Sequence, residues 1–195
     1  PGSEKSRLQS TTPRCGNSFL AVCRQTTELE MEGPSLVILK ETLKNLRGKT
    51  ILEASGLASL GYEAPPGQKI VAFKTWGKHF LIVLKTTTLR IHFLMFGSYR
   101  INETKDRRPS LHLALSDSTD LNFYTCSVRE IAGNLEEVYD WSADVMRAVW
   151  DPGKARKKLK AQPELNVGDA LLDQNKFAGV GNIIKNEVLF RIRIH

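Results

Sequence analysis

The sequence has 195 residues, of which 41% are hydrophobic and 25% charged, as is usual for a folded protein long enough to bury a core. No apolar run approaches the roughly 20 residues that cross a bilayer, which excludes a membrane-spanning helix. Lysine and arginine number 28 against 21 acidic residues, a net charge of +7, and this excess favours a polyanionic partner, nucleic acid before an anionic membrane surface.

The cysteines and histidines are scattered along the chain. Cys15, Cys23 and Cys126 match no Cys-x-x-Cys zinc pattern, and their odd number argues against a disulfide framework. Free thiols in a reducing compartment are the simpler interpretation. We therefore expect no metal site in this chain.

Residues 1–30 are polar, with one short apolar run at 19–22. That run is shorter than the roughly 7–15 apolar residues of a signal-peptide core. We expect a disordered leader or extension here.

A helix is predicted to begin at Gly33. Pro34 suits its first turn, and Gly48 suits its C-cap. Leucines recur between them at helical spacing: Leu36, Leu39, Leu43 and Leu46.

Strand patterns follow, from Thr50 to about Tyr124. Runs rich in Val, Ile, Phe and Thr are separated by short turns, and one of them alternates apolar and polar residues, as a half-buried strand does. The predicted strands are 69–73, 79–85, 88–93, 111–115 and 121–126.

After Gly133 the pattern becomes helical. Helices are predicted over 135–149, 153–161, 169–176 and 182–190, and the second carries five lysines and arginines within 154–160. The predicted fold class is α+β, with an N-terminal helix and an antiparallel β-sandwich in 31–133 and a helical DNA-binding domain in 134–195.

Two glycines, Gly179 and Gly181, flank Val180 in the turn between the last two predicted helices, and Asn182 opens the final helix. Glycine permits positive φ and close backbone approach. A helix N-terminus offers free N–H donors and a positive dipole end, which suit a phosphate. A plain helical hairpin with an Asn cap is the alternative.

The string 171–183, Leu-Leu-Asp-Gln-Asn-Lys-Phe-Ala-Gly-Val-Gly-Asn-Ile, resembles the helix–two-turns–helix signature of the formamidopyrimidine-DNA glycosylase/endonuclease VIII family. The resemblance implies that Asn182 binds a phosphate beside a DNA lesion. Lys185, with the basic helix, Arg191 and Arg193, would add the positive charge that holds the DNA backbone.

Met31-Glu32-Gly33-Pro34-Ser35 resembles the family's N-terminal string. There, the amine of a terminal proline attacks the sugar C1′ and forms a Schiff base, while the next glutamate transfers protons. Glu32 matches that acid, and Met31 stands in place of the proline. An α-amino group, with a pKa of about 8, is the amine that is most easily uncharged.

Two alternatives remain for Met31. If translation starts there, the primary amine of Met31 occupies the position of the nucleophile. The initiator methionine would be retained, because the next residue, Glu32, is bulky. If residues 1–30 are present, no amine exists at that position. The alternative role for Glu32 is structural: an acid at the start of a helix interacts favourably with the positive end of the helix dipole.

Two further segments carry the resemblance. In 75–81, Lys78 follows a tight turn, and the family's lysine at this hairpin assists β-elimination; a surface lysine is the alternative. In 92–101, a strand ends in Leu94, Met95 and Phe96 before a glycine. The family uses this loop as a wedge in place of the flipped nucleotide, and core packing is the alternative. His92 is assigned to a backbone phosphate.

The resemblance implies a base-excision repair glycosylase with AP lyase activity on oxidised bases, closer to endonuclease VIII, which acts on pyrimidines. The expected partner is double-stranded DNA with an oxidised base or abasic site, and no membrane partner is expected. We expect the protein to be a monomer that works in the bacterial nucleoid or in a nucleus. No cofactor is expected, because the four cysteines of the family's zinc finger are missing.

The rival interpretation is a catalytically impaired DNA-binding fragment of the same family. A plain helix–turn–helix binder of duplex nucleic acid is a third, but it leaves Glu32 and Lys78 unexplained.

Overall fold

The computed structural model describes residues 30–56 and 67–194. The predicted leader, except for Glu30, and the cysteines Cys15 and Cys23 lie outside the described residues.

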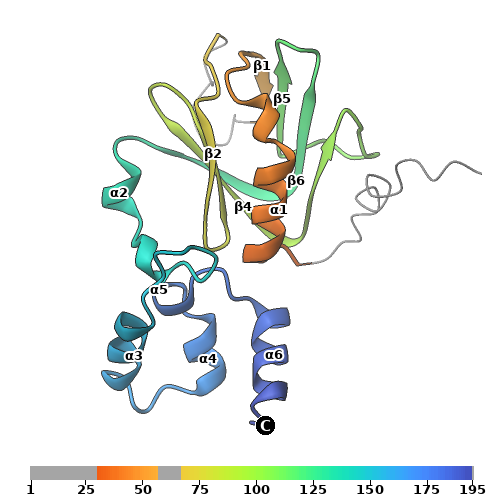
Figure 1. Cartoon of the computed structure of the whole chain (residues 1–195). Coiled ribbons are helices and arrows are strands. Elements are labelled where there is room, and N and C mark those ends of the chain that lie inside the picture. The colour runs from red at the N-terminus through yellow and green to blue at the C-terminus, as the bar shows by residue number, and fades with distance from the viewer. Residues whose placement is uncertain (1–29, 57–66, 195) are drawn as a thin grey trace, which may run out of the picture.

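Six antiparallel strands form one continuous sheet in the order β1-β5-β6-β4-β3-β2 (Figure 1). The strands are β1 (Ile51–Ser55), β2 (Ala72–Trp76), β3 (His79–Val83), β4 (Thr88–Ile101), β5 (Leu111–Leu115) and β6 (Asp120–Ile131). The prediction for β5 is confirmed to the residue. β2 begins three residues later than predicted, because Lys69 forms only an isolated bridge with Thr50.

The predicted sandwich is made by one sheet that curls over its own core. The register of β4 against β6 shifts between Phe93 and Ser98, and such a bulge bends a strand and increases its twist. The rings of Phe80 on β3 and Phe123 on β6 lie 6.3 Å apart, although β4 separates these strands in the sheet. The two halves of the sheet therefore share one interior.

Helix α1 (Gly33–Thr42) covers this interior, lying across the sheet in Figure 1. Leu36, Leu39 and Leu43 are buried in the same cluster as the sheet residues, as their spacing predicted. A 3₁₀ turn, Lys44–Leu46, follows the helix. Gly48 then adopts φ +85, and its N–H donates to the Ile70 carbonyl oxygen at 2.7 Å.

The described chain after the sheet consists of short helices. They are α2 (Leu135–Val138), a 3₁₀ turn (Trp141–Ala143), α3 (Pro152–Lys160), α4 (Val167–Leu172), α5 (Gln174–Phe177) and α6 (Asn182–Arg191). Of these, α2 lies beside the sheet, and α3, α4 and α6 lie below it (Figure 1). The predictions for α3 and α6 are confirmed to within one residue at each end.

The single helix predicted over 135–149 is wrong. Tyr139 is extended, and the Asp140 side chain starts the 3₁₀ turn by accepting the Ser142 N–H. The Asp140 carbonyl oxygen accepts the indole N–H of Trp76 at 2.9 Å. A tertiary contact with β2 thus uses a carbonyl that a continuous helix would have needed for itself.

The prediction of a single helix over 169–176 is also wrong, because this segment forms parts of two helices. Asp173 is extended between α4 and α5, and its side chain accepts the Asn175 N–H at 2.9 Å. An aspartate that can cap a new helix ends the preceding one.

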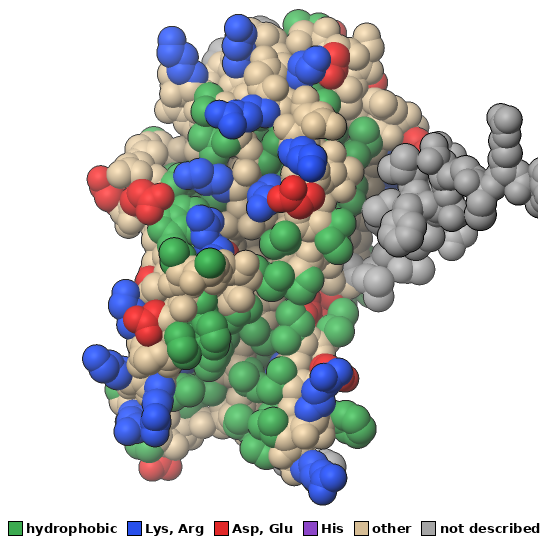
Figure 2. Space-filling model, viewed as in Figure 1, with side chains coloured by type: hydrophobic (Ala, Val, Ile, Leu, Met, Phe, Trp, Pro, Cys, Tyr) green, Lys and Arg blue, Asp and Glu red, His purple; other side chains and the backbone are tan. Residues whose placement is uncertain are grey.

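A second apolar cluster joins the sheet to the helices. Trp76 and Leu81 from the sheet pack with Leu135, Tyr139 and Ala178. Figure 2 shows Lys and Arg side chains over the sheet-bearing half and α3, and apolar side chains over the face of the lower helices. None of the described helices is long and apolar enough to cross a membrane.

His79, at the start of β3, makes stability depend on pH. Its Nδ1 lies 3.1 Å from the Tyr139 hydroxyl, and burial, with Arg90 and His92 nearby, lowers its pKa from 6.5 to about 4. The unfolded chain therefore takes up this proton first as pH falls, so stability is complete above pH 6.5 and lost toward pH 4.

We expect His79→Gln to reduce this loss by roughly 1–3 kcal/mol. Urea unfolding measures the loss as the difference between the free energies of unfolding at pH 7 and at pH 4.5, and this difference is compared between wild type and variant. Equal differences in the two proteins would show that another group is responsible.

Candidate active site

The carboxylate of Glu32 caps helix α6. Oε1 accepts the Ile183 N–H at 2.7 Å, and Oε2 accepts the Ile184 N–H at 3.2 Å. Glu32 is only 3% exposed, and the helix's own N-cap residue is Gly181, which has no side chain to offer. A carboxylate at this position satisfies two free N–H groups and meets the positive end of the dipole.

This contact corrects one part of the phosphate prediction. The N–H groups of Ile183 and Ile184 are occupied by Glu32, so they are not free for a phosphate. Asn182 is exposed beside them as the first residue of α6, and its Oδ1 accepts from the Lys185 ammonium at 3.1 Å. Asn182 and Lys185 therefore form a side-chain pair rather than part of a backbone cradle, and their contact with a DNA phosphate stays a prediction.

Glycines let the start of α1 approach the turn before α6. The Gly33 N–H donates to the Gly179 carbonyl oxygen at 2.9 Å, and a Cβ on Gly33 would lie only 3.0 Å from Gly179. A Cβ on Gly181 would lie 2.2 Å from the Glu32 Oε1. The absence of side chains is what allows Glu32 to reach its amides.

Gln174 holds this turn from inside. Its Oε1 accepts the Gly179 N–H at 3.0 Å, and its Nε2 donates to the carbonyl oxygens of Leu172 and Val180 at 2.9 and 3.0 Å. The sequence string included Gln174, but its spacing alone indicated no role. The side chain braces the backbone that presents the α6 N-terminus.

The hairpin between β2 and β3 brings Lys78 to the same place. Gly77 adopts φ +54, and a Cβ there would lie 3.2 Å from the Gly179 nitrogen, so the hairpin tip packs on the turn before α6. The Lys78 ammonium lies 3.5 Å from the Glu30 carboxylate. The Lys78 side chain thus lies next to the segment that leads into Met31 and Glu32.

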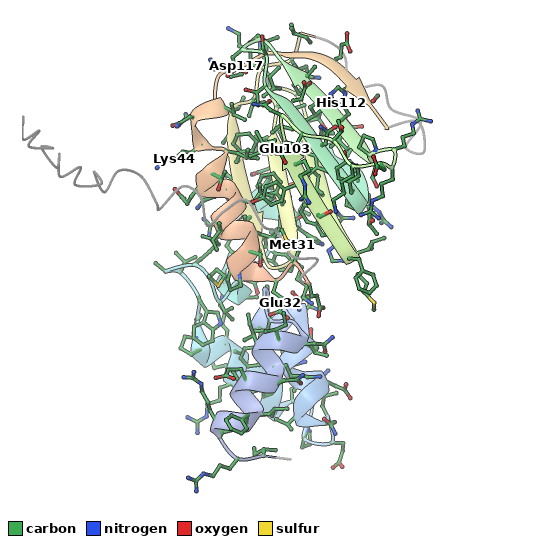
Figure 3. All side chains as sticks on the ribbon, turned by 90° about the vertical axis from the view of Figure 1, so that its right-hand side faces the viewer. Met31, Glu32, Lys44, Glu103, His112 and Asp117 are labelled. Atoms are coloured by element: carbon green, nitrogen blue, oxygen red, sulfur yellow. The ribbon has the colours of Figure 1, made fainter. Side chains whose placement is uncertain are left out.

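Met31 is half-buried and its side chain packs against the core of the sheet. Its backbone runs between Glu30, which pairs with Lys78, and Glu32, which caps α6. Figure 3 shows Met31 and Glu32 at the junction of the sheet and the helices, with Lys44, Glu103, His112 and Asp117 away from it on the sheet-bearing half. In the 195-residue chain the Met31 nitrogen belongs to a peptide bond.

The three predicted wedge residues are exposed. Leu94, Met95 and Phe96 are 48%, 73% and 55% exposed, and they occupy the bulge of β4, where Phe96 has φ 64. The core alternative is therefore wrong for all three. His92, two residues before them, is half-buried, and its Nδ1 lies 3.2 Å from the Lys78 carbonyl oxygen. It supports the lysine hairpin.

Part of the predicted basic surface has structural roles. The Lys158 ammonium donates to Asp140 and to the Asn175 carbonyl oxygen at 3.1 and 2.6 Å. Arg191 pairs with Glu187 at 2.6 Å. Lys158 thus ties α3 to the 3₁₀ turn and to α5, while Arg191 pairs within α6, and both contacts lower the charge available to a polyanion.

The described residues hold no group of three His, Cys, Asp or Glu side chains that could bind a metal ion. Of the three cysteines in the sequence, Cys126 lies among the described residues, and burial raises the pKa of its thiol to about 11. The residues present do not fit a four-cysteine zinc site.

Asp144 is a buried acid that the sequence patterns did not single out. It is 1% exposed, and burial raises its pKa against hydrogen bonds from the N–H groups of Met146 and Gly77. Its backbone bridges to Ala178, so it links the lysine hairpin to the turn before α6.

Asp144→Asn should gain stability relative to wild type as pH rises from about 4 to 7, because a raised folded pKa means that ionisation weakens the fold. We expect a gain on the order of 1 kcal/mol, measured by urea unfolding at both pH values. Asp140→Asn is the opposite control, because its hydrogen bond with Ser142 lowers the pKa of that carboxyl. The same sign in both variants would contradict the assignment.

Gly181→Ala should push Glu32 away from its amides. The backbone of Gly181 is extended, with φ −122, so alanine is permitted there and the added Cβ is the only obstacle. We expect a loss of about 1–3 kcal/mol by thermal or urea unfolding. Gly168→Ala, within α4, is the matched control and should be neutral or slightly stabilising. If Gly181→Ala costs the same in a Glu32→Ala background, the clash is not with Glu32.

The chain is similar in sequence to proteins of one known family. Residues 31–130 match the family model of the formamidopyrimidine-DNA glycosylase N-terminal domain. The chain is 32% identical to mouse endonuclease 8-like 3 over 176 residues, covering 78% of this chain and 29% of that protein. It is 32% identical to the formamidopyrimidine-DNA glycosylase of Carboxydothermus hydrogenoformans over 125 residues, 64% of this chain and 47% of the relative.

The fold is also that of solved members. A crystal structure of the Lactococcus lactis formamidopyrimidine-DNA glycosylase, bound non-covalently to DNA with an AP site, has a TM-score of 0.71 at 19% identity. The likeness covers 84% of this chain and 70% of that one. The chain spans less than half the length of the two curated relatives named above. With its family model, its sequence relatives and its fold in agreement, the chain belongs to the formamidopyrimidine-DNA glycosylase/endonuclease VIII family.

Proposed function

We propose that this chain, in a form that begins at Met31, is the part of a base-excision repair enzyme that binds damaged duplex DNA, releases an oxidised base and cleaves the strand at the abasic site. Pyrimidine lesions are the first candidates. The supporting observation is the convergence at one junction of Met31, the capping carboxylate of Glu32 and the Lys78 hairpin. These groups come from the start of α1 and from the sheet, and α6 holds the carboxylate in place.

In a chain that begins at Met31, the free α-amine is the nucleophile. It attacks C1′ of the damaged nucleotide, and the N-glycosidic electrons leave with the base. The sugar ring opens as O4′ takes a proton, and a C1′ imine with the Met31 nitrogen remains. Removal of a C2′ proton then expels the 3′ phosphate, and water returns the amine.

Glu32 is the proton carrier nearest this amine, because it is the next residue. Its two oxygens each accept one N–H from α6 and keep further lone pairs for a proton. The helix fixes the carboxylate beside the reacting sugar, and this positioning is a large part of general acid–base catalysis. Lys78 is placed to assist the elimination step.

DNA is proposed to bind across the same junction. Asn182 and Lys185 would contact a phosphate beside the lesion, while Leu94, Met95 and Phe96 fill the space left by a flipped nucleotide. We infer that a monomer suffices, that no cofactor takes part in these steps, and that the protein works where chromosomal DNA lies, in a nucleus or a bacterial nucleoid.

A second candidate function is DNA binding without catalysis. The observation that favours it is the peptide bond at Met31, which leaves no amine beside Glu32 in the 195-residue chain. The two candidates differ only in whether a covalent intermediate can form.

Borohydride trapping on a duplex with one abasic site separates them. We expect the 195-residue chain to give no adduct and the chain that begins at Met31 to give one, because only the second has the α-amine. Mass spectrometry of the digested adduct should place the DNA remnant on the Met31 nitrogen. Met31-start chains with Glu32→Gln should trap or turn over about 10²–10⁴-fold more slowly.

Adducts from both chains would move the nucleophile to a side-chain amine, which Lys78→Gln would test. No adduct from either, together with salt-sensitive duplex binding, would leave the non-catalytic function.

A further inference from the structure

We propose that Glu30 is an inhibitory contact, a carboxylate of the chain itself that competes with DNA for Lys78. This inference rests on the proposed function of the junction as a DNA site. It assigns a role to a residue that lies just outside the segment matched by the family model, which begins at residue 31.

The geometry of Lys78 makes such a competition effective. Its backbone is held at the hairpin tip, where its carbonyl oxygen lies 3.2 Å from the His92 ring nitrogen and Gly77 packs against the turn before α6. The side chain is 20% exposed, so its ammonium has a restricted range. The Glu30 carboxylate meets it at 3.5 Å.

Glu30 is the more open partner, with 37% of its side chain exposed. Its negative charge stands where a DNA phosphate or an abasic sugar would approach Lys78, so DNA must displace it before the lysine can act. Partly exposed ion pairs of this kind are worth little, and displacement is expected to change binding by about two- to five-fold. A contact of this strength tunes access to the site without closing it.

The contact also depends on the chain that precedes Met31. Glu30 is joined to the Met31 nitrogen, so any chain that extends past Met31 in this way has both the carboxylate on Lys78 and an amide in place of the amine. Hydrolysis of the 30–31 peptide bond would detach Glu30 from the chain that carries Lys78 and would turn the Met31 amide into an amine in the same step. The new carboxyl group stays on residue 30.

The test uses the 195-residue chain with Glu30→Gln, and Glu41→Gln as its matched control. Both variants change the net charge by the same amount, so their general attraction for DNA is equal. Glu41 on α1 pairs instead with Lys40 of the same helix at 3.1 Å and with Lys44 of the following 3₁₀ turn at 4.0 Å. Any difference between the variants therefore reports on the position of the carboxylate.

The first measurement needs no DNA. Each protein is treated with a low dose of acetic anhydride, and acetylation at Lys78 is followed by mass spectrometry. Releasing the ammonium from its carboxylate should speed acetylation of Lys78 by about two- to five-fold in Glu30→Gln and leave it unchanged in Glu41→Gln.

The second measurement is fluorescence anisotropy with a duplex that carries a tetrahydrofuran abasic analogue. Glu30→Gln should bind about two- to five-fold more tightly than Glu41→Gln. In a Lys78→Gln background this advantage should disappear, because the competition is for the lysine.

Equal acetylation of Lys78 in the two variants would overturn the contact. Faster acetylation without tighter binding than the control would overturn the competition with DNA. Failure of the proposed catalytic function gives a different result. The chain that begins at Met31 would then form no borohydride adduct, while in the 195-residue chain Lys78 acetylation and duplex binding would still respond to Glu30→Gln.

Discussion

A buried carboxylate is stable only where hydrogen-bond donors replace the water that it loses, and in this chain the donors for Glu32 come from residues about 150 positions away. The first turn of α6 provides two N–H groups and the positive end of a helix dipole. The same contact fastens the beginning of α1, and with it the sheet, to the last described helix. The fold of two halves and the geometry of the candidate site therefore depend on this interaction together with the apolar cluster of Trp76, Leu81, Leu135, Tyr139 and Ala178.

The contact sets strict demands on the backbone around it. Gly33, Gly77, Gly179 and Gly181 meet where three separate segments approach more closely than side chains would allow. Gln174 then fixes the path of the turn with three hydrogen bonds. Close approach places the Met31 nitrogen, the Glu32 carboxylate and Lys78 within one small region, so the residues proposed for the chemistry also pack the junction.

Charge at this junction is balanced rather than simply positive. Lys78 faces Glu30, Lys158 pairs with Asp140 and Arg191 pairs with Glu187, whereas the partner of Lys185 is the neutral amide of Asn182. The net charge of +7 would attract a polyanion such as the proposed DNA partner, while local carboxylates would decide which cations it can reach. In the proposed function, binding strength and access to the chemistry are therefore set by different groups.

The sequence by itself determined the fold class, the strand at 111–115 and the basic helix, because periodicity and caps are local properties of the chain. The grouping of Glu32, Lys78 and the glycine turn was implied by the family resemblance and not by a local pattern. Prediction from the sequence failed over 135–149, where the indole of Trp76 takes a carbonyl from the helix, and at Asp173, which caps a second helix inside the predicted one. Only the tertiary structure decided that Glu32 occupies the amides expected for a phosphate, that Glu30 faces Lys78 and that Asp144 is buried. These outcomes depend on contacts between distant segments, whose hydrogen bonds and desolvation no local pattern encodes.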